Sequence, residues 1–189
     1  MRVIAGHAKG HRLKTPKGRG LRPTADRVKE ALFNILPHDL SGRKALDLFA
    51  GTGSLSIEAL SRGAEEAVLV DVSRDAAEAI EENLRAVKLA AKSRVLTAPV
   101  FKSVRMLSRR GEKFDLIFID PPYDKELVGE TLKAIAKEEL LAESGTAVAE
   151  HSVRERVEER YGTLVLTDQR RYGDTQLSFF VYSTAGINK

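Results

Sequence analysis

The sequence predicts an α/β fold with a mostly parallel sheet of seven strands. Short apolar runs rich in β-branched residues alternate with segments of helical periodicity, which is the order that builds βαβ units. The first of these strand-like runs leads into a glycine-rich turn and then a helix. With 189 residues, the chain is long enough for one domain with a full hydrophobic core.

The apolar pattern places the elements in order. The predicted strands are 44–49, 67–70, 94–97, 114–119, 145–149, 164–166 and 178–182. The last two flank Gly173 and should form a C-terminal antiparallel hairpin. The predicted helices are about 25–36, 55–61, 74–87 and 125–139. Thr24 and Ser73 are expected to cap the first and third of these helices, and Val28, Leu32 and Ile35 should form the first helix's packed face, away from Lys29.

Positive charge is concentrated at the N-terminus. Residues 1–25 contain seven Lys or Arg side chains and no acidic one, whereas the chain beyond Lys44 carries twenty basic and twenty-four acidic residues. Glycines and prolines favour a small hairpin with loops over residues 2–21. We therefore predict a basic N-terminal extension (residues 1–40, hairpin plus helix) that binds a polyanion, attached to a main domain of residues 41–189.

Composition excludes several classes of site. The chain has no cysteine, so disulfides, thiolate metal sites and cysteine nucleophiles are impossible. No stretch of 18 apolar residues is present, which predicts a cytoplasmic protein without membrane contact. His7 and His11 lack carboxylate partners at ligand spacing, so we expect no metal site there.

The glycine turn has the features of an anion-binding loop. Gly51 and Gly53 permit a tight turn, and the helix that follows offers free N–H groups. Ser56 occupies the position of the third glycine of the dinucleotide fingerprint, so that motif is incomplete. Asp47 adds an acceptor for an ammonium group, and Asp71, at the end of the second strand, is placed to bind a ribose diol. A bulky residue at Gly53 is expected to obstruct the ligand without unfolding the domain.

A second motif, Asp120-Pro121-Pro122-Tyr123, ends the buried strand 114–119. Two prolines stiffen the exit from the sheet, at the edge where α/β sheets bind ligands. A carboxylate, proline carbonyls and an aromatic ring together suit an exocyclic amino group on a planar base. As an isolated tetrapeptide it fits a simple strand terminator equally well.

Taken together, these motifs resemble those of Rossmann-like class I S-adenosylmethionine-dependent methyltransferases. Closer still is the RsmD family, bacterial enzymes that methylate N2 of a guanine in small-subunit (16S) ribosomal RNA. The segments that carry this resemblance are 2–6, 13–16, 22–28, 30–35, 47–53, 120–123 and 172–175. The sequence departs from the class I pattern at the position expected to contact adenine, where Thr97-Ala98-Pro99 replaces the acid that many of these enzymes have.

The resemblance implies a role for each motif. Asp120, Pro121, Pro122 and Tyr123 would be catalytic. S-adenosyl-L-methionine would contact Asp47, Phe49, Gly51, Gly53, Asp71 and, through backbone near the third strand, Val100. Lys9, Arg12, Lys14, Lys17, Arg19 and Arg22 would bind RNA. The expected protein is a monomeric rRNA methyltransferase that needs no metal and acts on 16S rRNA or a small-subunit assembly particle.

Three alternatives stay open at this point. The same tetrapeptide serves enzymes that methylate N6 of adenine in DNA or a glutamine side chain in a protein. A non-catalytic RNA-binding assembly protein could also use this fold. Because both cofactor motifs lie in the main domain, removal of residues 1–20 is expected to leave cofactor binding intact.

Overall fold

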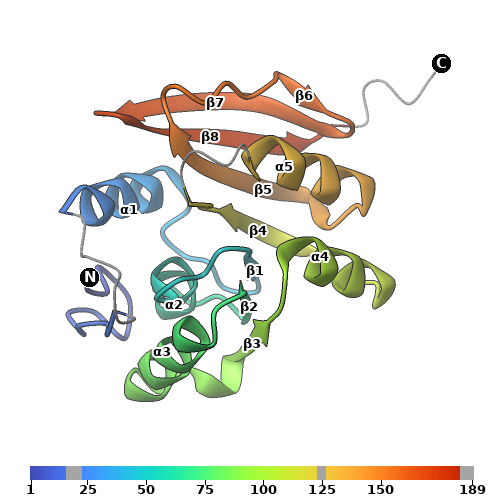
Figure 1. The fold of residues 1–189 in the computed structure, drawn as a ribbon. Helices are drawn as coiled ribbons and strands as arrows, with labels where there is room; N and C mark the ends of the chain where they lie inside the picture. The colour runs from blue at the N-terminus through green and yellow to red at the C-terminus, as the bar shows by residue number, and fades with distance from the viewer. Residues whose placement is uncertain (16–22, 123–126, 184–189) are drawn as a thin grey trace. The chain divides into compact units, whose positions relative to one another are not determined.

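The structure is a computed structural model that describes residues 1–15, 23–122 and 127–183, with the backbone alone at 23–25 (Figure 1). The chain divides into two compact units, Met1–Pro99 and Val100–Lys189. The predicted domain boundary at residue 40 stays a prediction.

Unit 1 contains a parallel three-stranded sheet in the order β3-β2-β1. Its elements are α1 (Pro23–Ile35), β1 (Lys44–Asp47), α2 (Ser54–Ser61), β2 (Glu66–Asp71), α3 (Arg74–Ala86), a 3-10 turn (Ala90–Lys92) and β3 (Ser93–Thr97). Each strand is followed or preceded by a helix in the predicted βαβ order, and the three predicted strands are confirmed. Because the strands are parallel, β1 and β2 end at the same edge of the sheet.

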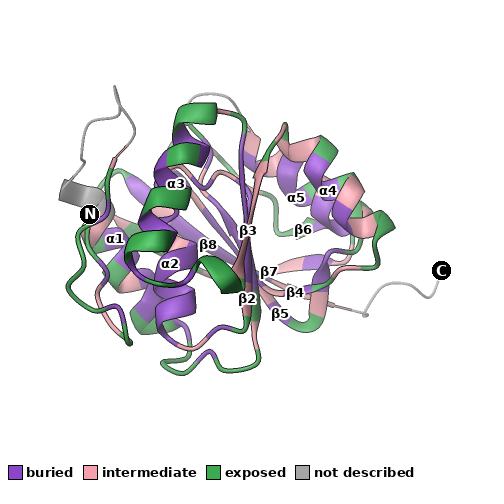
Figure 2. Cartoon of the chain, turned by 90° about the horizontal axis from the view of Figure 1, so that it is seen from below, coloured by how far each residue is buried: buried purple, intermediate pink, exposed green. Residues whose placement is uncertain are grey.

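The amphipathic helix α3 shows why the third predicted helix forms where it does. The hydroxyl of Ser73 accepts the N–H of Ala76 at 3.4 Å, which confirms the predicted cap. Ile80 and Leu84 are buried on one face, and the opposite face is exposed (Figure 2).

Helix α1 differs from the prediction in two respects. It begins at Pro23, so Thr24 lies inside its first turn and does not precede it. Val28 and Leu32 are buried as expected, but Ile35 is 41 % exposed and Lys29 is buried. The expected packed face is therefore wrong at Ile35 and Lys29. Lys29 is buried because its ammonium group lies beside the buried carboxylate of Glu58.

Residues 1–15 form a small hairpin, which confirms the predicted hairpin within the described part of the N-terminal extension. Arg2 and Arg12 form an antiparallel bridge. The N–H of Val3 bonds to the carbonyl of His11 at 3.0 Å, and the N–H of Gly10 bonds to the carbonyl of Val3 at 2.9 Å. Val3, Ala8 and Leu13 are buried. We call residues 1–15 the N-terminal hairpin.

Unit 2 contains five strands in the order β4-β5-β8-β7-β6. Its elements are α4 (Val100–Arg109), β4 (Phe114–Ile119), α5 (Leu127–Lys137), β5 (Leu141–Ser152), β6 (Arg160–Tyr161), β7 (Leu164–Tyr172) and β8 (Thr175–Tyr182). The β4–β5 pair is parallel and the other three pairs are antiparallel. The predicted C-terminal hairpin is confirmed as β7–β8.

Two elements of unit 2 were not predicted. The two-residue β6 raises the number of strands in the described chain from the predicted seven to eight. Helix α4 begins directly after Pro99, and its buried face is Ser103, Val104 and Leu107. None of the described helices has both the length and the apolar character required to cross a membrane.

Candidate active site

In unit 1, the glycine turn leads from the end of β1 to the start of α2 and is hydrogen-bonded to the end of β2. The N–H of Ala50 donates to the carbonyl of Val70 at 2.9 Å, and the N–H of Gly51 donates to the Asp71 carboxylate at 2.9 Å. Asp47 ends β1 and is 1 % exposed, and the hydroxyl of Ser56 donates to its Oδ2 at 3.4 Å. The predicted residues Asp47, Gly51 and Asp71 are thus brought to one sheet edge. We call residues 47–54 the cofactor loop.

Asp71 does more than the sequence predicts. Its Oδ2 holds the N–H of Gly51, and its Oδ1 accepts the N–H of Ser73 at 2.9 Å. The side chain is buried, with 6 % exposure. One carboxylate therefore fixes the shape of the cofactor loop and the start of α3.

Gly53 contradicts one expectation. Its φ is 75°, and it stands at the N-cap of α2, where no side chain caps the helix. A Cβ at this position would lie 3.1 Å from Cδ2 of Leu69 and 3.4 Å from side-chain atoms of Ile57 and Ile80. A larger residue would push into the core of unit 1, so substitution here would disturb folding and would not selectively block a ligand.

Val72 was missed by the sequence analysis. It follows Asp71 directly and is 71 % exposed, although most large apolar side chains in the described chain are buried. An exposed branched side chain beside Asp71, the predicted ribose-binding acid, has the apolar character that suits contact with a planar base. Val100, the predicted backbone contact, opens α4 in unit 2. Phe49 is half-buried in the cofactor loop.

In unit 2, Asp120 follows the last residue of β4 and is half-buried. Ile119 is paired with Ala149 of the neighbouring parallel strand. Pro121 is buried and Pro122 is exposed. The turn thus leaves a strand that is buried, as predicted, at every residue except the half-buried Asp115. Tyr123 lies outside the described residues.

The predicted RNA-binding residues fall into two groups. Lys9, Arg12 and Lys14 are exposed on the N-terminal hairpin. Lys14 forms an exposed ion pair with Glu82 at 2.8 Å. Lys17, Arg19 and Arg22 lie outside the described residues. Each of His7 and His11 places its Nδ1 near a backbone carbonyl, at 3.2 Å from Ser61 and 3.1 Å from Ala8 respectively.

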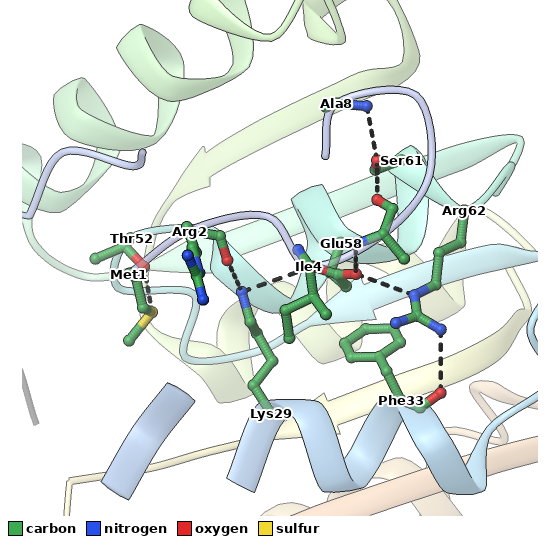
Figure 3. A network of polar contacts seen from close by, with 11 residues as sticks. Met1, Arg2, Ile4, Ala8, Lys29, Phe33, Thr52, Glu58, Ser61 and Arg62 are labelled. Carbon is green, nitrogen blue, oxygen red and sulfur yellow. Dashed lines mark hydrogen bonds and ion pairs between the residues drawn. The ribbon is translucent and has the colours of Figure 1, made fainter. Parts of the chain in front are cut away.

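A buried charge cluster holds the N-terminal hairpin against the rest of unit 1 (Figure 3). Glu58 on α2 is fully buried, and its carboxylate accepts the N–H groups of Ile4 at 2.7 Å and Ala5 at 2.9 Å. Arg62 donates to the same carboxylate at 3.0 Å, and the Lys29 Nζ lies 3.6 Å from it. Burial lowers the pKa of Lys29, and the nearby Glu58 opposes that shift.

The cluster also connects α1 with α2. Lys29 donates to the carbonyl of Arg2 at 2.6 Å, while Arg62 donates to the carbonyl of Phe33 at 3.1 Å and lies over its ring (Figure 3). A carboxylate in the otherwise apolar stretch Ile57–Leu60 was the one sequence signal for it.

Ser61 and Asn83 complete the attachment of the N-terminal hairpin. The Ser61 hydroxyl donates to the carbonyl of Ala5 at 2.6 Å and accepts the N–H of Ala8 at 3.0 Å. Asn83, 2 % exposed on α3, bonds both backbone groups of Lys14 and also the carbonyl of Thr52. The hairpin is therefore part of the packing of unit 1. These contacts argue against the expectation that removal of residues 1–20 leaves cofactor binding intact, which stays untested.

Within residues 1–15, 23–122 and 127–183, no group of three or more His, Asp or Glu side chains could hold a metal ion. Asp47 accepts a hydroxyl hydrogen bond from Ser56, and Asp71 accepts the backbone N–H of Gly51.

Comparison with known proteins extends across both units. The family model described as "Conserved hypothetical protein 95" matches residues 1–181. YlbH of Bacillus subtilis is 38% identical over 180 residues, which cover 95% of this chain and 98% of YlbH. The ribosomal RNA small subunit methyltransferase D of Escherichia coli K12 is 35% identical over 153 residues, covering 81% of this chain and 75% of the relative.

Solved structures agree with the sequence comparison. The structure of yhhF from Escherichia coli has a TM-score of 0.82 at 31% identity and covers 97% of this chain and 98% of that one. The structure of SMU.776, a methyltransferase complexed with SAH, has a TM-score of 0.68 at 17% identity, covers 85% of this chain and 50% of that one, and so supports the α/β methyltransferase fold alone. This chain belongs to the Conserved hypothetical protein 95 family, which includes the ribosomal RNA small subunit methyltransferases D.

Proposed function

We propose that this protein transfers a methyl group from S-adenosyl-L-methionine to the exocyclic N2 of a guanine in small-subunit (16S) ribosomal RNA. The main observation that supports this proposal is the 35% identity over 153 residues to the Escherichia coli enzyme, a ribosomal RNA small subunit methyltransferase. Two predicted motifs stand at strand ends in agreement with this proposal, the cofactor loop after β1 and Asp120 after β4.

The residues of unit 1 fit each part of the methyl donor. Asp47 offers a buried carboxylate to the ammonium group, and the uncapped start of α2 offers N–H groups to the carboxylate. Asp71, at the end of β2, would accept hydrogen bonds from the ribose hydroxyls. Val72 would supply an apolar contact for adenine.

S-adenosylmethionine supplies an electrophilic methyl group on a positively charged sulfur. The acceptor nitrogen is a weak nucleophile because its lone pair is delocalised into the base. Hydrogen bonds from the amino group to Asp120 and to the Pro121 carbonyl would localise that lone pair and orient it. Positioning would supply most of the acceleration, and the Asp120 carboxylate would stabilise positive charge that develops on the nitrogen. As the new N–C bond forms, the C–S bond breaks to leave a neutral thioether, and the nitrogen loses one proton to Asp120 or to water. Tyr123 would stack on the base.

The N-terminal hairpin would hold the RNA. Lys9 and Arg12 are exposed, and each basic side chain that meets a phosphate adds to a salt-dependent affinity. Its attachment to α2 and α3 makes it a rigid surface. The proposed substrate is 16S rRNA, naked or within an assembly particle.

Turnover of Asp120→Ala tests the proposal. The variant should bind S-adenosylmethionine within a few-fold of wild type and lose about 100-fold or more in kcat, because the contact acts in the transition state. Asp115→Ala, on the same strand, serves as the control and should keep kcat. Near-normal single-turnover rates in Asp120→Ala would make the tetrapeptide structural.

A further inference from the structure

We infer that Asn83 couples the N-terminal hairpin to the cofactor loop, so that binding of the methyl donor stabilises the surface that carries Arg12 and Lys14. The inference rests on the proposed function. It concerns a positioning residue and adds a thermodynamic link between the cofactor site and the RNA-binding surface.

The contacts of Asn83 are unusual in joining three separate parts of unit 1. From α3, its Oδ1 accepts the N–H of Lys14 at 2.7 Å, and its Nδ2 donates to the carbonyl of Lys14 at 3.0 Å. The same Nδ2 donates its second hydrogen to the carbonyl of Thr52 at 3.0 Å. The side-chain amide therefore imitates a neighbouring strand for the hairpin and simultaneously holds the cofactor loop.

The bond to Thr52 fixes a peptide group of the loop from one side. The N–H of Gly53 belongs to the same peptide and donates to the carbonyl of Ala50 at 2.6 Å, which fixes the other side. Gly51 and Gly53 on either side have left-handed φ values of 54° and 75°. A rotation of this peptide would reorient the start of α2, where the carboxylate of the methyl donor is proposed to bind.

A second contact supports the same link. The hydroxyl of Thr52 lies 3.7 Å from the Met1 sulfur, a weak acceptor, and the carbonyl of Met1 accepts the N–H of Leu13 at 3.0 Å. One end of the N-terminal hairpin thus contacts Thr52 directly through Met1, and the other end reaches Thr52 through Asn83. Asn83 is 2 % exposed and Thr52 is 9 % exposed, so water cannot readily replace these partners.

Linkage then requires a reciprocal effect. If a ligand of the cofactor loop stabilises the arrangement that Asn83 holds, it must stabilise the hairpin, and RNA on the hairpin must tighten the ligand by the same factor. Couplings of this kind are typically about 5-fold to 150-fold. The ion pair between Lys14 and Glu82 cannot provide this coupling, because both side chains are exposed to solvent.

Hydrogen exchange on the wild-type protein tests the link without any substitution. S-adenosylhomocysteine is the probe. It should slow exchange at residues 47–54 and also, by about fivefold or more, at the N–H groups of Val3, Gly10, Leu13 and Lys14. Protection confined to residues 47–54 would overturn the inference and leave the proposed function standing. Absence of protection at residues 47–54 would overturn both.

Substitution provides the matched comparison. The affinity for S-adenosylhomocysteine is measured with and without a small-subunit rRNA transcript in wild type, Asn83→Ala and Glu82→Gln. Glu82→Gln removes the neighbouring ion pair and leaves the Asn83 bonds, so it should keep the wild-type ratio. Asn83→Ala should bring the ratio to about 1. An unchanged ratio in a folded Asn83→Ala, or a wild-type ratio of 1, would contradict the coupling.

Discussion

The carboxylate of Glu58 on α2 accepts the backbone N–H of Ile4 at 2.7 Å, across 54 positions of sequence. The same carboxylate holds Ala5, Arg62 and Lys29, and it is fully buried. A buried charge with all its partners in place adds little net stability, but removal of one member leaves the others uncompensated. Docking of the N-terminal hairpin therefore depends on Glu58.

The first prediction concerns that carboxylate. Glu58→Gln leaves the charges of Lys29 and Arg62 buried, so it should lower the free energy of unfolding by about 3–5 kcal/mol. Glu82→Gln, which breaks only the exposed pair with Lys14, should change it by less than about 1 kcal/mol. Urea denaturation measures both variants. Equal effects would show that the cluster is not a coupled unit.

A second prediction concerns pH. Burial lowers the pKa of Lys29 below its ordinary value of 10.5. Between the lowered pKa and 10.5 the unfolded chain binds more protons than the folded one, so this lysine's contribution to stability rises with pH. The free energy of unfolding of wild type minus that of Lys29→Met should therefore increase with pH through that interval and stay constant at higher pH. A difference that stays flat from pH 7 to 11 would contradict the buried lysine.

Two glycines of the N-terminal hairpin form a matched pair for a third prediction. Gly6 and Gly10 have φ values of 77° and 87°, so an alanine at either position costs about 1–2 kcal/mol in backbone strain. A Cβ at Gly6 would lie 1.8 Å from the Ser61 carbonyl oxygen, whereas one at Gly10 meets nothing within 4 Å. Gly6→Ala should therefore undock the hairpin and be clearly less stable than Gly10→Ala. Equal thermal midpoints would contradict the close approach to α2.

Asp71 supplies the fourth prediction. Asp71→Ala removes the proposed ribose contact and the bond that shapes Gly51. Cofactor affinity should fall by at least the 1.5–3 kcal/mol of roughly one charge-assisted hydrogen bond, about 10-fold to 150-fold. Asp75→Ala, exposed in the first turn of α3, is the control and should bind normally in calorimetry. Retained affinity in Asp71→Ala would place the ribose elsewhere.

Much of the fold could be predicted because its signals are local. Apolar runs locate all three strands of unit 1 and also β4, and Ser73 caps α3 as expected. Helix α4 was missed although Val100, Val104 and Leu107 have helical spacing, because Pro99 interrupts the pattern before it. Strand β6 has two residues, which are too few to show the alternation of apolar and polar residues that predicts a strand.

The candidate site could be predicted only for side chains whose contacts lie at the end of their own strand. Asp47, Gly51 and Asp71 meet at the ends of β1 and β2, as parallel strands require. The roles of Lys29, Glu58 and Asn83 depend on partners 27 to 69 positions away, and helical periodicity alone places a lysine on the solvent side. The same distant contacts explain why the N-terminal hairpin is not the separable extension that its charge suggested.

Methylation of ribosomal RNA tests the central claim most directly. Small-subunit rRNA from a strain that lacks this protein is incubated with S-adenosylmethionine and either the wild-type protein or Asp120→Ala, and its nucleosides are then analysed. The account predicts N2-methylguanosine at one position with wild type and essentially none with Asp120→Ala. Methyl groups on adenine N6, or no RNA methylation by a folded protein that binds the cofactor, would contradict it.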